Sequence, residues 1–114
     1  MPAPIIKNDD PLYVLLRQGN VAEFNQRLAA GEVCDLTNAD FRSLELVGWE
    51  PVGIDLSGGY FRQADLRGVD LSSCQLAGAS LHGAKISGVL FPKSLSADEI
   101  NLSLLHGTRM RLSE

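Results

Sequence analysis

The sequence predicts a small all-β solenoid with helices at both ends. Two observations predict it: a five-residue period of apolar side chains over residues 34–93, and helix start and stop signals on both sides of that segment. A third, the length of 114 residues, is typical of one domain. We therefore expect one folding unit with an N-terminal helical cap (1–33), the repeat segment (34–93), and a C-terminal helical cap and tail (94–114).

Helix signals come before the repeat. Asp10-Pro11 predicts the start of one short helix, and Asn20 predicts the start of a second. Residues 11–31 also resemble one ankyrin-type helical pair, although the Thr-Pro-Leu-His signature of that unit is missing. Because the end of a solenoid exposes apolar side chains and unpaired backbone groups, we interpret the pair as a cap, with a partner-binding hairpin as the alternative.

The repeat consists of two apolar columns that advance five residues at a time. The first is interrupted only by Pro51 and contains Leu36, Phe41, Leu46, Leu56, Phe61, Leu66, Leu71, Leu76, Leu81, Ile86 and Phe91. The second lies two residues earlier, from Cys34 to Val89. A five-residue period fits neither a helix nor a strand. Each of the twelve pentads is therefore predicted to be a short extended side followed by a turn, because most end in Gly or a small polar residue.

These units resemble a known repeat family. Ala-Asp-Leu-Arg-Gly at 64–68 and Ala-Ser-Leu-His-Gly at 79–83 are similar to the A-(D/N)-L-x-x unit of pentapeptide-repeat proteins. The resemblance implies a right-handed quadrilateral β-helix with four pentads in each coil, so residues 34–93 would form about three coils. About three stacked units are also the minimum that buries the core of a solenoid.

One further helix signal follows the repeat. Ser96 begins a capping box, and Ile100 and Leu104 share a face that would close the last coil. Leu102 and Leu105 lie on another side of this helix. They would either form a homodimer interface or pack along the coil edge of a monomer.

Composition excludes several classes of protein. The net charge of -4, from 14 acidic and 10 basic side chains, is not the strongly basic balance of a nucleic-acid binder, so no direct nucleic-acid contact is expected. The uncharged apolar runs are shorter than the ~20 residues of a membrane span, so no membrane contact is expected. The first residues lack the pattern of a secretory signal, which favours a cytoplasmic setting.

Residue types for catalysis are scarce. His82 and His106 are the only histidines, and no phosphate loop, G-x-S-x-G or H-E-x-x-H motif occurs. We therefore expect no enzyme, no cofactor and no metal site. Cys34 and Cys74 lie two coils apart on the same face, at a separation of about 10 Å. That is too far for a disulfide, so both are expected to be buried, separate thiols.

A ladder of basic residues is one candidate for partner contact. At four pentads per coil, Arg42, Arg62 and His82 stack on one outward face. Like charges on neighbouring strands are unfavourable, which favours a site for an anionic partner. The alternative is a solvated face on which Asp40 neutralises Arg42.

The irregular segment 47–53 is a second candidate. Trp49 occupies a column that otherwise prefers small residues, and Pro51 interrupts the Leu column. Trp49 would either form an exposed apolar contact patch with Val47 and Val52 or pack inward under the N-terminal helices.

The sequence therefore favours a non-enzymatic protein–protein interaction module built on a short solenoid. The alternative is a DNA-mimicking regulator of DNA gyrase, similar to the quinolone-protection proteins of the same family. A mimic needs a continuous acidic face, whereas residues 34–93 carry seven acids and five bases. Three coils also rise only about 14 Å, against about 34 Å for one turn of DNA.

Overall fold

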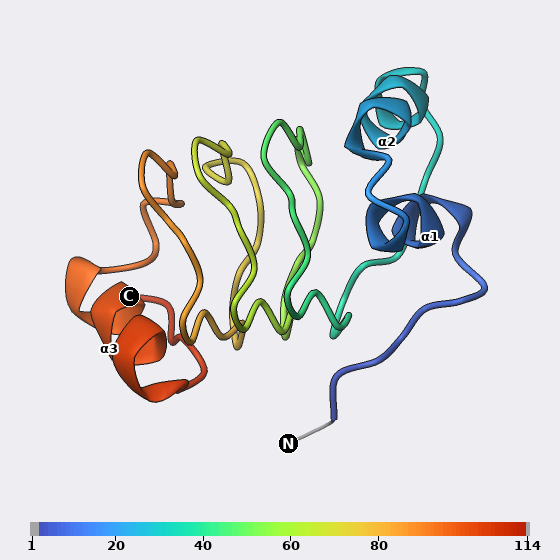
Figure 1. Ribbon diagram of the computed structural model, residues 1–114. Coiled ribbons are helices and arrows are strands. Elements are labelled where there is room, and N and C mark those ends of the chain that lie inside the picture. Colours follow the sequence, from blue (N-terminus) through green and yellow to red (C-terminus); the bar gives the residue numbers. More distant parts are fainter. Residues whose placement is uncertain (1–2, 114) are drawn as a thin grey trace.

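The computed structural model describes residues 3–113 and consists of a stack of coils with helices at both ends (Figure 1). Helix α1 (Pro11–Arg17) and helix α2 (Val21–Ala29) pack together at the N-terminal end. Helix α3 (Ala97–His106) lies at the other end, against the last coil. No helix among the described residues is long and apolar enough to cross a membrane.

Residues twenty positions apart lie side by side on consecutive coils. The parallel bridges between coils are Asp40–Tyr60, Glu45–Asp65, Asp55–Gln75, Tyr60–Ser80, Asp65–Lys85 and Asp70–Leu90. Backbone hydrogen bonds follow the same step: the Leu66 N–H donates to the Lys85 carbonyl at 2.9 Å, and the Lys85 N–H donates to the Ala64 carbonyl at 2.9 Å. Each coil therefore takes four pentads.

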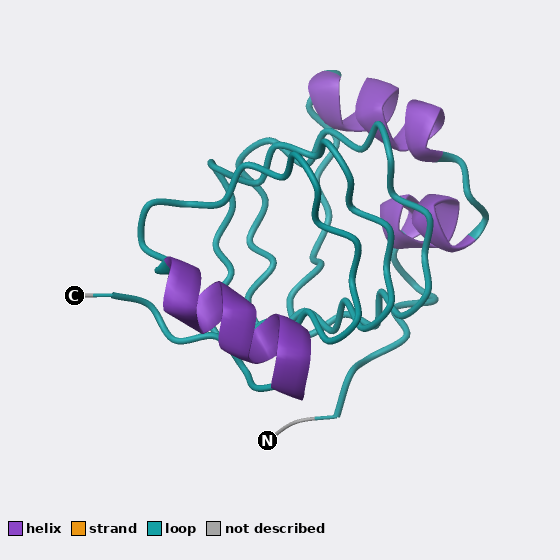
Figure 2. Ribbon diagram, turned by 60° about the vertical axis from the view of Figure 1, so that its left-hand side comes forward, coloured by secondary structure: helices purple, strands orange, loops and turns teal. Residues whose placement is uncertain are grey.

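The predicted strands are replaced by single bridges. Within residues 3–113 every β contact is an isolated bridge, and the three helices are the only elements longer than one residue (Figure 2). The reason is the density of turns, because the backbone turns a corner of the coil at positions such as Gly68, with φ of 75°, and Gly88, with φ of 73°. Too few residues remain between turns for a strand, so the all-β assignment is wrong in this respect.

The two apolar columns form the core. Leu56, Leu66 and Leu71 are fully buried, and even Pro51 points inward. The Phe41 and Phe61 rings stack with centroids 4.6 Å apart, since the register places them on adjacent coils. The columns therefore face inward throughout the stack, as the pentad pattern predicts.

The helices begin at the residues that the sequence predicts. Asp10 caps α1 by accepting hydrogen bonds from the N–H groups of Leu12 and Tyr13, at 3.0 and 3.2 Å. Asn20 caps α2 and Ser96 caps α3 in the same way, each bonding the N–H three residues later. The three predicted helix starts are confirmed.

Pro51 interrupts the ladder between the first and second coils. It has no N–H to donate, and within the described residues no bridge joins positions 50 and 70. Side chains take over some of the freed backbone groups: the Cys74 thiol donates to the Pro51 carbonyl, and Ser73 Oγ accepts from the Gly53 N–H, both at 3.0 Å. The distortion expected from Pro51 is thus local.

Candidate interaction site

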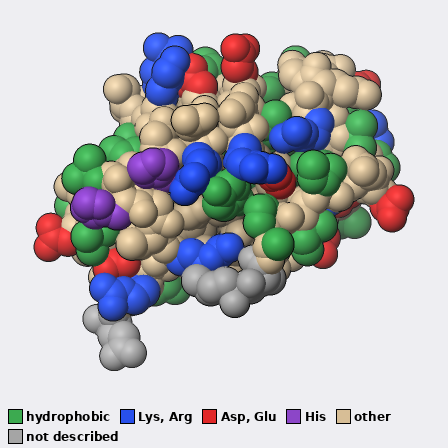
Figure 3. Space-filling model, turned by 60° about the horizontal axis from the view of Figure 1, so that its bottom comes forward, with side chains coloured by type: hydrophobic (Ala, Val, Ile, Leu, Met, Phe, Trp, Pro, Cys, Tyr) green, Lys and Arg blue, Asp and Glu red, His purple; other side chains and the backbone are tan. Residues whose placement is uncertain are grey.

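Two arginines from adjacent coils lie over one aromatic ring. The Arg42 and Arg62 guanidinium carbons lie 5.6 and 5.5 Å from the centroid of Tyr60. Tyr60 is positioned by its bridges to the coils before and after it. Both distances fall within the range of a cation–π contact. Figure 3 shows Lys and Arg side chains gathered with His and apolar side chains along one face of the molecule.

Arg42 is bound to a buried carboxylate. Its Nε and Nη2 donate to Asp40 Oδ2 at 3.1 and 2.9 Å, and Asp40 is only 2% exposed. Burial alone would raise the pKa of Asp40, but the hydrogen bonds from Arg42 outweigh it and lower this pKa below its usual value. The Arg42 side chain is nevertheless 54% exposed, so it neutralises Asp40 and still faces the solvent.

Arg62 forms no ion pair with any described residue and lies at the C-terminal end of α3. A Cβ placed on Gly107 would lie 3.2 Å from Arg62 Nη2 and 3.4 Å from His82 Cβ. A helix C-terminus attracts cations, which gives Arg62 a part in seating α3. We call the surface formed by Arg42, Tyr60, Arg62 and His82 the arginine face.

His82 and its neighbour Ser80 carry unused polar atoms. His82 Nδ1 and Ser80 Oγ are buried and have no hydrogen-bond partner among the described residues. His106 lies in the last turn of α3, at the opposite end of that helix from its cap. Among residues 3–113 no three His, Cys, Asp or Glu side chains lie close enough together to hold a metal ion.

Trp49 does not belong to a surface patch. It is 2% exposed, and its ring packs against Phe24 of α2 and against Phe41, with centroid distances of 5.7 and 5.8 Å. The interpretation of Trp49 as an exposed contact residue is therefore wrong. Its ring packs inward under α2, which is the other of the two arrangements that the sequence allows. The physical reason is that α2 supplies an aromatic lid over a ring too large for the column.

Val47 and Val52 are exposed, at 54% and 71%, on two sides of an α2 contact. Asn25 of α2 makes this contact, donating to the Gly48 carbonyl at 2.8 Å and accepting from the Glu50 N–H at 2.9 Å. Val47 lines a shallow depression with Val21 on one side, and Val52 lines another with Leu28 on the other side. The two valines therefore do not form one patch.

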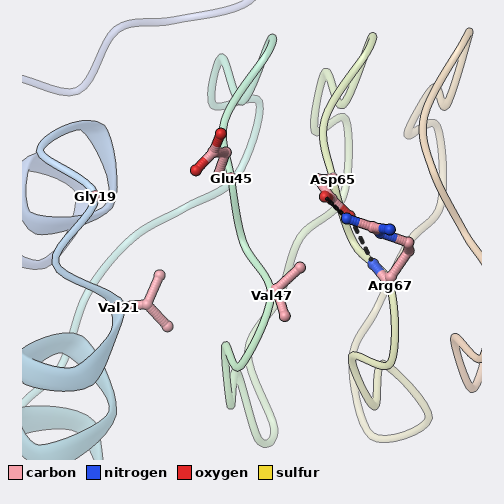
Figure 4. A pocket seen from close by; sticks show the side chains of 6 residues that line it. All are labelled: Gly19, Val21, Glu45, Val47, Asp65 and Arg67. Atoms are coloured by element: carbon pink, nitrogen blue, oxygen red, sulfur yellow. Dashed lines mark hydrogen bonds and ion pairs between the residues drawn. The ribbon is translucent and has the colours of Figure 1, made fainter.

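Figure 4 shows the depression beside Val47, between α2 and the first two coils. The side chains that line it are Val21, Glu45, Val47, Asp65 and Arg67, with Gly19 at its rim. Arg67 Nη2 donates to Asp65 Oδ2 at 2.7 Å, so these two charges neutralise each other, whereas Glu45 has no ion pair with a described residue. The lining of this depression therefore presents no unpaired base to an acidic partner.

The C-terminal helix has the two sides that the sequence predicts. Ile100 and Leu104 pack against the core. Leu102 and Leu105 are exposed, at 41% and 67%, and line a shallow depression. A homodimer through these leucines stays a prediction.

The thiols are free, but their burial differs from the prediction. Cys74 is buried, and burial raises the pKa of its thiol to about 11. Cys34 is only half-buried, so the expectation of two buried thiols is wrong for it. Cys34 opens the first coil, and no earlier coil covers it.

Three residues of these surfaces were not found from the sequence: Tyr60, Asn25 and Ser103. Tyr60 could have been found, because the register that aligns Arg42 with Arg62 also places it two positions before Arg62. Asn25 had no sequence signal, since an amide on a helix is common. Ser103, which is buried and accepts from the Leu81 N–H at 2.8 Å, had none either.

Comparison with known proteins agrees with this register. A family model described as pentapeptide repeats matches residues 52–91 in eight copies. No curated protein and no solved structure matches the chain. Residues 34–51 of the first coil lie outside the matched range and contain the irregular Trp49 and Pro51. Residues 52–91 thus match pentapeptide repeats, as the sequence pattern predicts.

Proposed function

We propose that this chain is a non-enzymatic interaction module that binds an acidic segment of a protein partner through the arginine face. The family of its repeats supports the general role of an interaction module. The partner chemistry is argued from the side chains of the arginine face. Arg62 presents an unengaged guanidinium fork, and Arg42 adds the exposed part of a guanidinium bound to Asp40, beside one tyrosine ring.

The observation that carries the proposal is the state of Arg62. It is exposed, its guanidinium lies over the Tyr60 ring, and no described carboxylate is paired with it. The guanidinium groups of Arg27, Arg42, Arg67 and Arg111 are instead paired with acids of this chain. A guanidinium binds a carboxylate with two parallel hydrogen bonds, which is the chemistry that a Glu or Asp of a partner supplies.

The proposed scaffold is the right-handed quadrilateral β-helix of the repeat family. The twenty-residue register, the single parallel bridges and the turns at the pentad ends support this assignment. The cytoplasmic setting belongs to the same proposal, and the free state of both cysteines is consistent with it.

The gyrase-directed DNA mimic is the weaker proposal. It requires a continuous run of free carboxylates on one face. Asp35, Asp40 and Asp65 are instead paired with Lys7, Arg42 and Arg67. No observation on the described residues favours this alternative.

A pull-down with three immobilised proteins tests the proposal. The wild type, the variant Arg62→Ser and the control Arg67→Ser are incubated with the native cell extract. We expect one set of proteins to bind the wild type and the control and to be lost with Arg62→Ser, most clearly at low salt. Retention of that set by Arg62→Ser, at unchanged thermal stability, would contradict the role of the arginine face.

A further inference from the structure

The last coil is covered on only part of its outer side. Helix α3 and the C-terminal segment supply partners for one stretch of it: the Gly78 N–H donates to the Met110 carbonyl, the Leu81 N–H to Ser103 Oγ, and the Gly83 N–H to the Leu104 carbonyl. In Figures 1 and 2, α3 lies across one part of this coil and leaves the rest open. The open part is residues 84–91.

The open part carries backbone groups that are paired in the coil before it. There the N–H groups of Leu66, Gly68 and Leu71 donate to residues 85, 87 and 90, at 2.8–2.9 Å. The equivalent N–H groups of Ile86, Gly88 and Phe91 donate to no described residue, and the carbonyls of Ala84 and Val89 accept from none. An unpaired edge of this kind is a template for another extended chain.

The apolar columns are incompletely buried at the same place. Ile86, Val89 and Phe91 pack against the core but are only half-buried, whereas Leu66 and Leu71 below them are fully buried. Leu90 beside them is 58% exposed. A further extended segment would therefore gain hydrogen bonds and cover apolar surface in one step.

The basic side chains at the open part of the last coil favour an acidic binding segment. Lys85 continues the column of Glu45 and Asp65, to which the bridges join it, and it is exposed without an ion pair among the described residues. Lys93 is exposed at the end of the same stretch. In parallel pairing the next residue of the column lies opposite Lys85, where an acid is favourable and a base is not.

We propose that residues 84–91 form a β-augmentation site, which takes an extended segment of a partner protein in parallel, with an acidic residue opposite Lys85 and an apolar residue over Ile86. The site is separate from the arginine face and does not depend on it. An acidic residue next to an apolar one is the pattern of the pentads themselves, such as Asp65-Leu66. The occupant thus acts as the start of a fourth coil.

The probe is a synthetic peptide with the sequence of residues 64–71, Ala-Asp-Leu-Arg-Gly-Val-Asp-Leu. Amide hydrogen exchange of the free protein should be fast at Ile86 and Gly88 and slow at Leu66 and Gly68. Titration with the peptide should shift the amide resonances of residues 84–91 and slow the exchange of Ile86 and Gly88. A control peptide with lysine at both aspartate positions should bind about fivefold more weakly.

Two variants of the protein separate backbone pairing from charge. Ile86→Pro removes the donor but no internal hydrogen bond, and Pro51 shows that this column accepts proline. Ile86→Pro should lower the affinity for the peptide at least about tenfold. Ile86→Ala keeps the N–H and should lower this affinity less. Lys85 is exposed, so Lys85→Glu should leave the fold intact. This variant should bind the lysine-containing control peptide more tightly than the aspartate-containing peptide. The test therefore stays valid if Ile86→Pro does not fold.

Three results would overturn the proposal. The first is protection of the Ile86 and Gly88 amides in the free monomer. The second is equal binding of the peptide to the wild type, Ile86→Pro and Lys85→Glu. The third is a doubled mass in light scattering that Ile86→Pro abolishes, since the occupant would then be a second copy of this chain rather than an acidic partner.

Discussion

Leu71 and Ser72 are neighbours in the chain with opposite environments. Leu71 is fully buried in the stack, whereas Ser72 is exposed and bonds only the Asp70 carboxylate beside it. Leu71→Ala should lower the free energy of unfolding by about 2–5 kcal/mol, because it leaves a cavity in the core. Ser72→Ala should lower it by about 1 kcal/mol or less. Urea denaturation measures both, and equal losses would contradict the inward register.

Carboxyl groups with lowered pKa values make the stability depend on acid pH, and Asp35 and Asp40 are two of them. Hydrogen bonds from Thr37, with Lys7 beside it, lower the pKa of Asp35 to about 2, and the pKa of Asp40 is lowered by Arg42 against the effect of burial. A carboxyl group whose pKa is lower in the folded state than in the unfolded state stabilises the fold. Its contribution is complete at a pH above the unfolded-state pKa, near 4. The contribution is lost as the pH falls through the folded-state pKa.

Unfolding free energy should therefore fall as the pH is lowered from about 4 to about 2. The variant Asp40→Asn should be less stable at neutral pH, since Arg42 loses its buried partner, and its stability should fall less steeply over this range. Thermal unfolding as a function of pH measures the difference. A steeper fall in Asp40→Asn than in the wild type would reverse the assigned direction of the Asp40 shift.

At the scale of the elements, one amide adds hydrogen bonds to the Phe24–Trp49 packing that holds α2 on the first coil. Asn25 bonds the carbonyl of Gly48 and the N–H of Glu50, next to the place where Pro51 interrupts the ladder. Asn25→Ala should lower the free energy of unfolding by about 1–2 kcal/mol, because two backbone groups lose their partner. Gln26→Ala, one position along the same helix, is the control.

Exposure of Trp49 gives a second readout of this attachment. Phe24 of α2 covers the indole ring in the wild type. Tryptophan fluorescence should therefore be quenched more readily by a soluble quencher in Asn25→Ala than in Gln26→Ala. Equal quenching and equal stability in the two variants would show that packing alone holds α2.

At the scale of the whole molecule, the five-residue period is the sequence feature that predicts the fold best. It assigns the inward columns and, with the family resemblance, the twenty-residue coil that aligns Arg42 with Arg62. It does not reveal that each side of a coil holds at most one bridge among the described residues, because that depends on the length left between turns. The direction of Trp49 also depends on tertiary packing, since Phe24 and Asn25 come from a separate element.

The same register makes the arginine face a composite of three coils. Arg42, Tyr60 with Arg62, and His82 belong to different coils, and they are close only because residues twenty apart are stacked. A ligand of this face must therefore contact residues that are distant in sequence. The central claim is that the arginine face, which this stacking assembles, binds acidic groups of a partner.

Chemical-shift mapping with an octaglutamate peptide tests that claim most directly. Polyglutamate carries the carboxylates but has no apolar side chain to place over Ile86. The ring resonances of Tyr60 and the Nε–H resonances of Arg42 and Arg62 should shift together with one affinity, which weakens as salt is added. Shifts at Arg67 as large as those at Arg62, or no shift of the Tyr60 ring, would contradict the account.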